Sequence, residues 1–494
     1  MNTFGLDLTQ LDEDDELTFR RVSKLDEVVI PLKGGFGSAL EPSVGEGEKV
    51  EAGEIIARND NSLSTPVHSS VNGEVAEIVE LEYFHEETLE WLDDMIPAVK
   101  IAAEGGLELT GKGVSWEKEE PANLRELLYL GGVTGFGQTG IPTEFNSSYF
   151  PPDSVNSILI NGVRISPFAR HLVNYGDELS SFKKGLRILA RSFPDAQLHF
   201  ALDEETYREM EDMGSGQRIK VHAVSGESYL DQSKYLARDL LGVEGLDAGG
   251  FLLEHGILAL DELVPLLTYR VVEEGVPFVR NRFSLTGPGA NSALYEVPIG
   301  SSLGRVIRSD ISTDGDYVNI LGGALTGIRL DDLDIPVGKG NSSLTRLEEP
   351  KETDTLAWIQ TGLTKNSYTN AFLSALFPDK KKKSDAGLHG EERPCVYCGY
   401  CSEVCPVDIL PFQIYKTHTH DMVDEVNRLQ PQRCVDCGLC SYVCPSKLPL
   451  SETLKDAKKS QPGEIDNYVK YEETEEGLKP AELGLNQDRG EDVE

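Results

Sequence analysis

The sequence predicts a multidomain α+β protein whose last domain is helical and binds metal through cysteines. Three observations lead to this prediction. The chain has 494 residues, which is too long for one domain at roughly 100–200 residues per domain. Stretches of β pattern and of alternating strand and helix pattern follow one another along the chain. All eight cysteines lie between Cys395 and Cys444, which argues against disulfides spread over a secreted fold.

The charge balance limits the classes of partner. There are 46 Lys and Arg residues against 84 Asp and Glu residues, a formal net charge of −38, and so acidic a surface repels a nucleic-acid backbone. No apolar run approaches the about 18 residues of a transmembrane helix. The first residues lack the basic and apolar segments of a signal peptide. We therefore expect a cytoplasmic protein that binds no nucleic acid and can dock on a membrane partner.

The first hundred residues predict a lead-in followed by a small β barrel. Residues 1–25 are acidic and are expected to be poorly structured. Short β runs broken by glycine and proline follow in residues 26–105 and predict an antiparallel barrel, which is similar to the hammerhead domain of biotinyl and lipoyl carriers. Carrier domains of that type have a lysine at the hairpin tip. Residues 64–68 contain none, so we expect a structural module.

Residues 106–275 alternate between strand and helix patterns. VNSILING and AQLHFAL have the apolar runs of buried strands, and LSSFKKGLRILARSF between them has helical periodicity. This alternation predicts a Rossmann-like α/β domain with a parallel sheet. ALDELVPLLTYRVVEEG predicts a closing helix that ends at Gly275.

Residues 276–345 return to a β pattern with glycine-rich turns. A VPIG step at Val297–Leu303 and a GG-x-x-x-G turn at Gly322–Gly327 resemble the soluble-ligand-binding β-grasp domain. Three further segments are predicted: a linker helix at 346–390, the cysteine domain at 391–458, and a disordered acidic tail at 459–494.

The cysteines form the motif C-x-x-C-x-x-C-x-x-x-C-P twice, beginning at Cys395 and at Cys434. This is the spacing of bacterial two-cluster ferredoxins, in which three cysteines hold one [4Fe-4S] cluster and the fourth ligates the other. We therefore expect two [4Fe-4S] clusters. The predicted ligand sets are Cys395, Cys398, Cys401 and Cys444 for one cluster, and Cys434, Cys437, Cys440 and Cys405 for the other.

Zinc is the alternative metal, but a zinc site closes with four ligands and does not need this motif twice. The 28 residues between Cys405 and Cys434 include the helical stretch DMVDEVNRL. We therefore expect an α-helical dicluster ferredoxin domain and not a small β-rich one. Two neighbouring clusters would relay single electrons between other redox centres.

A glycine-rich loop opens the α/β domain, and such loops let backbone N–H groups approach a phosphate or flavin. Its candidate binding residues are Gly135, Gly137, Gly140 and Thr143. The stretch from Gly137 to Thr143 resembles the GGAGFPT sequence of RnfC, a subunit of the Rnf ion-pumping complexes, which shares it with the NADH- and FMN-binding subunit of respiratory complex I. Together with the order of the four domains, this resemblance covers roughly residues 26–455.

Two departures from the RnfC pattern fall where FMN or NADH would bind. The family loop continues to a lysine that contacts the flavin phosphate, and Asn146 stands at that position here. The next strand of the family ends in NGAECEP, whose acidic residue belongs to the nucleotide site, whereas this chain has NGVRISP at residues 161–167. FMN and NADH are thus implied by the resemblance and disfavoured by these substitutions.

A second resemblance concerns residues 356–378 and the sequence CPVDILP at 405–411, which are similar to segments of NqrA from the sodium-pumping NADH:quinone reductase. It implies a peripheral electron-transfer subunit on the cytoplasmic side of the inner membrane. There it would pass electrons toward quinone or the membrane subunits of a Na+- or H+-translocating complex, with no catalytic residue of its own. Two alternatives stay open: an RnfC-like NADH dehydrogenase subunit with FMN, and a soluble dicluster ferredoxin-like adaptor.

Overall fold

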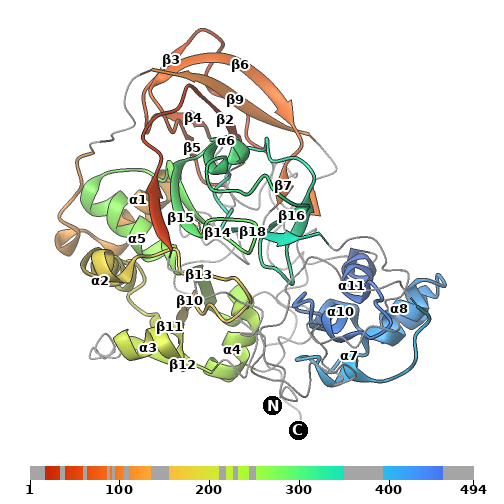
Figure 1. Cartoon of the computed structure of the whole chain (residues 1–494). Coiled ribbons are helices and arrows are strands. Elements are labelled where there is room, and N and C mark those ends of the chain that lie inside the picture. The colour runs from red at the N-terminus through yellow and green to blue at the C-terminus, as the bar shows by residue number, and fades with distance from the viewer. Residues whose placement is uncertain are drawn as a thin grey trace.

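The computed structural model describes residues 17–33, 39–58, 64–85, 90–91, 95–104, 109, 111–134, 155–210, 218–225, 232–243, 252–349 and 393–459. These residues form a β barrel, a parallel sheet with helices, a mixed β sheet and a helical domain (Figure 1). No described helix is long and apolar enough to cross a membrane. The glycine-rich loop from residue 135, the helix predicted at 356–378 and the acidic tail lie outside the described residues.

The barrel pairs its strands in antiparallel fashion, as the sequence predicts. Its four-stranded sheet has the order β2-β9-β6-β3, and strands β4 and β5 form a second sheet. Apolar side chains from both sheets, including Val28, Ile56 and Val99, share one core. The bounds are β2 Glu27–Pro31, β3 Lys49–Val50, β4 Ile55–Ala57, β5 Val67–His68, β6 Gly73–Leu81, β7 Phe84–His85, β8 Glu90–Trp91 and β9 Ile96–Ala103.

The α/β region holds a four-stranded sheet in the order β12-β11-β10-β13, and all its strands run parallel. Alternate side chains enter two apolar clusters, so both faces are covered. Helices α1, α2 and α5 contribute to one cluster and α4 to the other. The bounds are η2 Trp116–Lys118, α1 Pro121–Leu130, β10 Ser157–Gly162, α2 Tyr175–Ser192, β11 Gln197–Asp203, α3 Glu204–Met210, β12 Ile219–Val224, α4 Ser233–Leu241, η7 Leu252–His255, β13 Ile257–Asp261, α5 Leu263–Tyr269 and η8 Arg270–Glu274.

The closing helix is shorter than the sequence predicts. Residues Ile257–Asp261 form strand β13 because they pair with β10, and α5 begins only at Leu263. The π-helical segment η8 continues α5 and ends at Gly275, whose φ of 69° suits glycine. The sheet order places β10 between β11 and β13. Open parallel sheets usually bind ligands where the strand order reverses, which here is at the carboxyl ends of β10 and β13.

The region after Gly275 holds a mixed six-stranded sheet in the order β1-β15-β14-β18-β16-β17. The VPIG sequence ends β15, and the Ser302 hydroxyl caps helix α6 by accepting a hydrogen bond from the Arg305 N–H. The expectation that residues 1–25 are poorly structured is wrong for Thr18–Arg21, which form β1 and pair with β15. The other bounds are β14 Arg280–Thr286, β15 Ala293–Pro298, α6 Leu303–Ile307, β16 Tyr317–Leu321, β17 Ile328–Leu330 and β18 Ser343–Glu348.

The cysteine-rich region folds into short helices, as the sequence predicts. One of them, α9, lies within the DMVDEVNRL stretch. Figure 1 shows this domain beside the mixed sheet, with α8 on the side away from the sheet. The bounds are α7 Tyr400–Glu403, α8 Pro411–His418, α9 Val423–Arg428, η10 Pro431–Arg433, α10 Leu439–Val443 and α11 Leu450–Lys459.

Candidate functional site

The two cysteine motifs adopt the same backbone geometry. Tyr397 and Asp436, each two residues after the first cysteine of its motif, have φ values of 54° and 53°. This left-handed conformation turns their N–H groups toward the sulfur atoms of Cys395 and Cys434, at 3.4 Å in both motifs. The glycine before the next short helix and the third residue after the last cysteine also have positive φ in both motifs. The sequence repeat is therefore a structural repeat.

Four cysteines from both motifs line one pocket. They are Cys395, Cys398, Cys401 and Cys444, which we call the outer set. Aromatic and aliphatic side chains complete the walls of the pocket, among them Tyr397, Phe412, Leu448 and Leu450. The structure thus brings together the four cysteines that the spacing predicts as ligands of one cluster.

The other four cysteines, Cys405, Cys434, Cys437 and Cys440, are called the inner set. Burial raises the pKa of the Cys437 and Cys440 thiols, and the nearby Cys405 raises both further. Cys405 and Cys434 also pack against the same apolar cluster, around Ile414. Cys405 therefore lies with the second motif although it belongs to the first, as the crossover predicts.

Both sets suit a group larger than one metal ion. No disulfide joins any of the eight cysteines. Among the described residues, no three His, Cys, Asp or Glu side chains are arranged to hold a single ion, so neither set there forms a tetrahedral zinc site. Four cysteine sulfurs with apolar surroundings are the donors of a [4Fe-4S] cluster, and its iron would offset the cost of burying thiolate charge.

The inner set lies against the body of the protein. Leu325, in the glycine-rich turn after β16, packs with Cys437 and with apolar side chains of α7 and α10. The backbone of Gly438 is so close to the Leu325 carbonyl that a Cβ atom there would lie 2.1 Å from its oxygen. Arg238 on α4 donates to the Pro406 carbonyl at 3.4 Å. In contrast, Cys398 of the outer set is exposed.

The glycine-rich loop is described only at its beginning. Gly135, Gly137, Gly140 and Thr143 lie outside the described residues, so their role stays a prediction. The carbonyl of Gly132 accepts a hydrogen bond from Lys339 at 2.9 Å, and Lys339 also donates to the Thr65 hydroxyl at 3.1 Å. Burial lowers the pKa of Lys339 to about 7. Sequence reasoning missed this lysine, which links the barrel, the loop and the mixed sheet.

A buried ionic network occupies the carboxyl end of the parallel sheet. Arg164, which follows β10, lies 3.0 Å from Asp261 and 3.0 Å from Glu262, at the end of β13. His171 contacts Glu262 at 2.7 Å and Asp203, the last residue of β11, at 3.0 Å. Burial would lower the pKa of His171, but Glu262 and Asp203 outweigh it and raise the pKa to about 9. The imidazole is therefore charged at neutral pH.

This network lies at the crevice where an open parallel sheet would bind a nucleotide. Arg164 is one of the residues that depart from the family pattern, and its guanidinium is paired with two carboxylates. Sequence reasoning singled out Arg164 but missed its partners. The one sequence feature that points to them is that Asp203, Asp261 and Glu262 end or directly follow buried strands.

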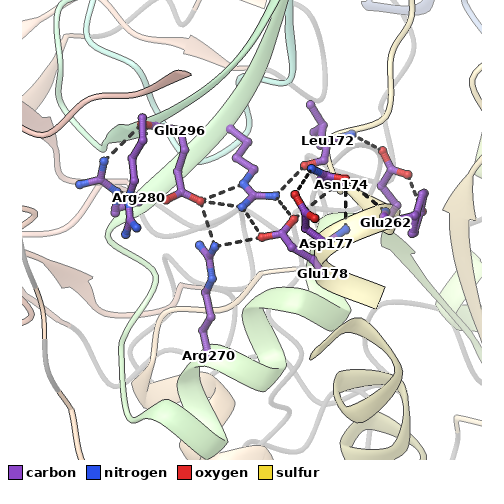
Figure 2. Close-up of polar contacts among 12 residues, drawn as sticks. Leu172, Asn174, Asp177, Glu178, Glu262, Arg270, Arg280 and Glu296 are labelled. Atoms are coloured by element: carbon purple, nitrogen blue, oxygen red, sulfur yellow. Dashed lines mark hydrogen bonds and ion pairs between the residues drawn. The ribbon is translucent and has the colours of Figure 1, made fainter. Parts of the chain in front are cut away.

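A second network joins the α/β region to the mixed sheet (Figure 2). Arg282 on β14 donates to both carboxylate oxygens of Glu178 on α2 at 2.6 Å, and to Glu296 on β15 at 2.7 Å. Leu172 connects the two networks, because its carbonyl accepts from Arg282 at 3.0 Å and its N–H donates to Glu262 at 2.6 Å. These contacts fix the α/β region against the mixed sheet.

Comparison with known proteins identifies two matching domains. Residues 12–100 match the RnfC barrel sandwich hybrid domain, and residues 381–448 match a 4Fe-4S dicluster domain. The dicluster domain carries two [4Fe-4S] clusters, as the cysteine spacing predicts. The solved structure of an NAD+-reducing [NiFe]-hydrogenase in the H2-reduced state matches 71% of this chain and 62% of its own at 12% identity. Its TM-score of 0.38 is too low to establish a shared fold.

Two relatives extend over most of the chain. One is the RnfC-type component of the proton-translocating ferredoxin:NAD(+) oxidoreductase complex of Clostridium ljungdahlii. It is 22% identical over 416 residues, which cover 81% of this chain and 80% of that protein. The other is the corresponding component of the ion-translocating oxidoreductase complex of Salmonella typhimurium. It is 24% identical over 419 residues, which cover 81% of this chain but only 51% of that protein. The resemblance to NqrA stays a prediction. The chain is a homologue of the RnfC proteins, with their N-terminal barrel and a 4Fe-4S dicluster domain.

Proposed function

We propose that this chain is the peripheral electron-transfer subunit of a membrane-bound, ion-translocating oxidoreductase of the Rnf/Nqr type. The observation that carries the proposal is the pairing of two four-cysteine sets in the dicluster domain of an RnfC homologue. The relatives are themselves components of ion-translocating oxidoreductase complexes. The partners of this chain are then the other subunits of its complex.

The outer set would hold one cluster and the inner set the other. A [4Fe-4S] cluster supplies one-electron redox chemistry. The protein positions and shields it, because the N–H groups of Tyr397 and Asp436 donate to cysteine sulfur and apolar side chains surround both sets. Hydrogen bonds to the sulfurs and exposure to solvent help to set cluster potentials. The exposed Cys398 therefore favours different potentials for the two clusters.

The alternative, an NADH dehydrogenase subunit with FMN, has weaker support. The Arg164 guanidinium is paired with Asp261 and Glu262 at the carboxyl end of the sheet. Asn146 provides no cation for a flavin phosphate, and losing one charge-assisted contact costs about 1.5–3 kcal/mol. The chain as a whole is strongly acidic, which disfavours an anionic dinucleotide. We therefore propose that electrons reach the clusters from another redox protein.

Several finer assignments belong to the same proposal. The parallel sheet is assigned as a Rossmann-like domain and the mixed sheet as a β-grasp domain, with the boundaries predicted from the sequence. Quinone as an acceptor, Na+ or H+ as the translocated ion, and a place on the cytoplasmic side of the membrane follow from the resemblance to Rnf and Nqr subunits. A soluble ferredoxin-like adaptor is the remaining alternative, and its signature would be stable isolation without membrane subunits.

The test uses the full chain, purified anaerobically with its clusters. Dithionite should bleach the cluster absorbance completely, whereas NADH with added FMN should leave it unchanged over minutes. Rapid bleaching by NADH would support the dehydrogenase alternative. Copurification of membrane subunits with a tagged chain from its native host supports the complex, and repeated isolation of the chain alone from solubilised membranes and cytosol supports the adaptor.

A further inference from the structure

The dicluster domain exposes more apolar surface than the rest of the described chain. Of the seven large apolar side chains that are exposed among the described residues, five lie in this domain. The two most exposed are Val396 and Tyr397, at 64% each. They lie between Cys395 and Cys398 and line the pocket of the outer set. Exposed apolar side chains next to a redox site are typical of a surface that contacts another protein.

Two cations border this apolar surface. Lys416 on α8 donates to the Tyr397 hydroxyl at 3.3 Å and lies 5.8 Å from the ring centroid. The backbone N–H of Arg393 donates to the carbonyl of Ser446, a pocket residue, at 2.9 Å. We call Arg393, Val396, Tyr397 and Lys416 the outer rim. The two acids that precede Arg393 in the sequence lie outside the described residues.

The charge of the domain differs from that of the chain. Residues 393–459 contain eight Lys and Arg residues and eight Asp and Glu residues, whereas the whole chain has a net charge of −38. An acidic protein that approaches this chain is therefore repelled by most of its charge and least repelled by this domain. Charge patterns of this kind orient partners during diffusional encounter.

The arrangement of the two sets gives them different neighbours. The inner set faces the mixed sheet through Leu325 and the α/β region through Arg238. The outer set opens beside α8, on the side away from the sheet in Figure 1. An external electron carrier can therefore come close to the outer set, while the inner set is covered by the body of the protein.

We propose that the outer rim is the docking surface for a small acidic iron-sulfur protein that exchanges single electrons with the outer site. The proposal rests on the proposed function, since it requires a cluster at the outer set. Only one electron moves between the two proteins, and no bond forms or breaks. An acidic carrier fits the charge pattern, and a one-electron carrier fits the redox chemistry of the site. The apolar Val396 and Tyr397 would lie at the centre of the contact, with Arg393 and Lys416 at its edge.

Charge reversal of the rim tests the proposal. The variant Arg393→Glu/Lys416→Glu is compared with Arg208→Glu/Arg428→Glu, which changes the net charge equally at two arginines whose side chains are each 77% exposed. The probe is a purified, reduced, acidic two-cluster bacterial ferredoxin, and stopped-flow absorbance gives the second-order rate constant. At low salt the rim variant should be slower by roughly tenfold or more, with a weaker dependence on ionic strength. The control should stay within about twofold of the unchanged chain.

A second variant tests the apolar part of the rim. Val396→Ser should slow the reaction at high salt, where charge effects are screened, and should leave the extent of reduction by excess dithionite unchanged. Equal rates for the rim and control variants would overturn the docking proposal, as would a ferredoxin that does not react with a fully dithionite-reducible chain. Failure of dithionite to reduce the chain, or an absence of iron, would instead overturn the proposed function.

Discussion

Glu296 should be the most sensitive residue of the network that joins the α/β region to the mixed sheet. Its side chain is 1% exposed and lies 3.0 Å from Arg21, 2.9 Å from Arg270, 3.5 Å from Arg280 and 2.7 Å from Arg282. Burial alone would raise the pKa of Glu296, but Arg270 and Arg282 lower it to about 2. One carboxylate therefore balances the charge of several arginines. The change Glu296→Gln keeps the shape of the side chain and removes that charge.

The cost depends on what each arginine retains. Arg21 is 61% exposed and can turn to water, and Arg282 keeps both of its hydrogen bonds to Glu178. Arg280, which is 8% exposed, keeps only backbone carbonyl partners, those of Val22 and residue 296. Removing one partner of a buried ion pair typically costs about 3–5 kcal/mol, and we expect that loss for Glu296→Gln.

The comparison variant Arg282→Met should cost less, about 1–3 kcal/mol. After that change Glu296 still contacts three arginines, and Glu178, which is 21% exposed, keeps Arg270 at 3.6 Å and some contact with water. A matched control is Glu104→Gln. Glu104 is 60% exposed and pairs with Lys49 at 3.5 Å, so its change should cost less than about 1 kcal/mol.

Hydrogen exchange of peptides from β14, β15 and α2 measures these losses locally, which suits a multidomain chain whose unfolding need not be two-state. Cluster absorbance should not change in any variant, since Glu296 is not in contact with the cysteine domain. The reasoning is refuted if Glu296→Gln costs less than about 1 kcal/mol, or if Arg282→Met costs more than Glu296→Gln.

Three further predictions concern the clusters and the ionic network. Anaerobically purified chain should contain about eight iron and eight acid-labile sulfide, and stoichiometric zinc without iron in elemental analysis would contradict this. Cys405→Ser should disturb the EPR signal of the cluster at the inner set, and Cys444→Ser that of the cluster at the outer set; the opposite pattern would show that the ligands do not cross over. His171, with a pKa raised from 6.5 to about 9, should stabilise the fold fully below pH 6.5 and lose that contribution as the pH rises through 9. From this shift we expect a loss of about 3 kcal/mol, and thermal unfolding between pH 6 and 10 should show it in the unchanged chain but not in His171→Gln.

Local spacing was enough to predict several parts of the structure. The repeated cysteine motif predicted two clusters, and the structure groups the same cysteines. Apolar periodicity predicted α2, β10 and β11, because the side-chain repeats of a helix and a strand are visible within one segment. The glycine-rich VPIG step predicted the turn from β15 to α6. In each case the residues that determine the element are neighbours in the sequence.

The sequence by itself therefore determined the elements, the antiparallel pairing of the barrel, and the metal that the cysteines suit. Tertiary structure alone decided that Thr18–Arg21 form a strand, which Arg20 ties to Asp310, 290 positions away. It also decided that Ile257–Asp261 are a strand and not the start of a helix, and that Leu325 covers the inner set and leaves the outer one open. The physical reason is that these contacts gain their free energy from residues far apart in the chain, so no local pattern encodes them.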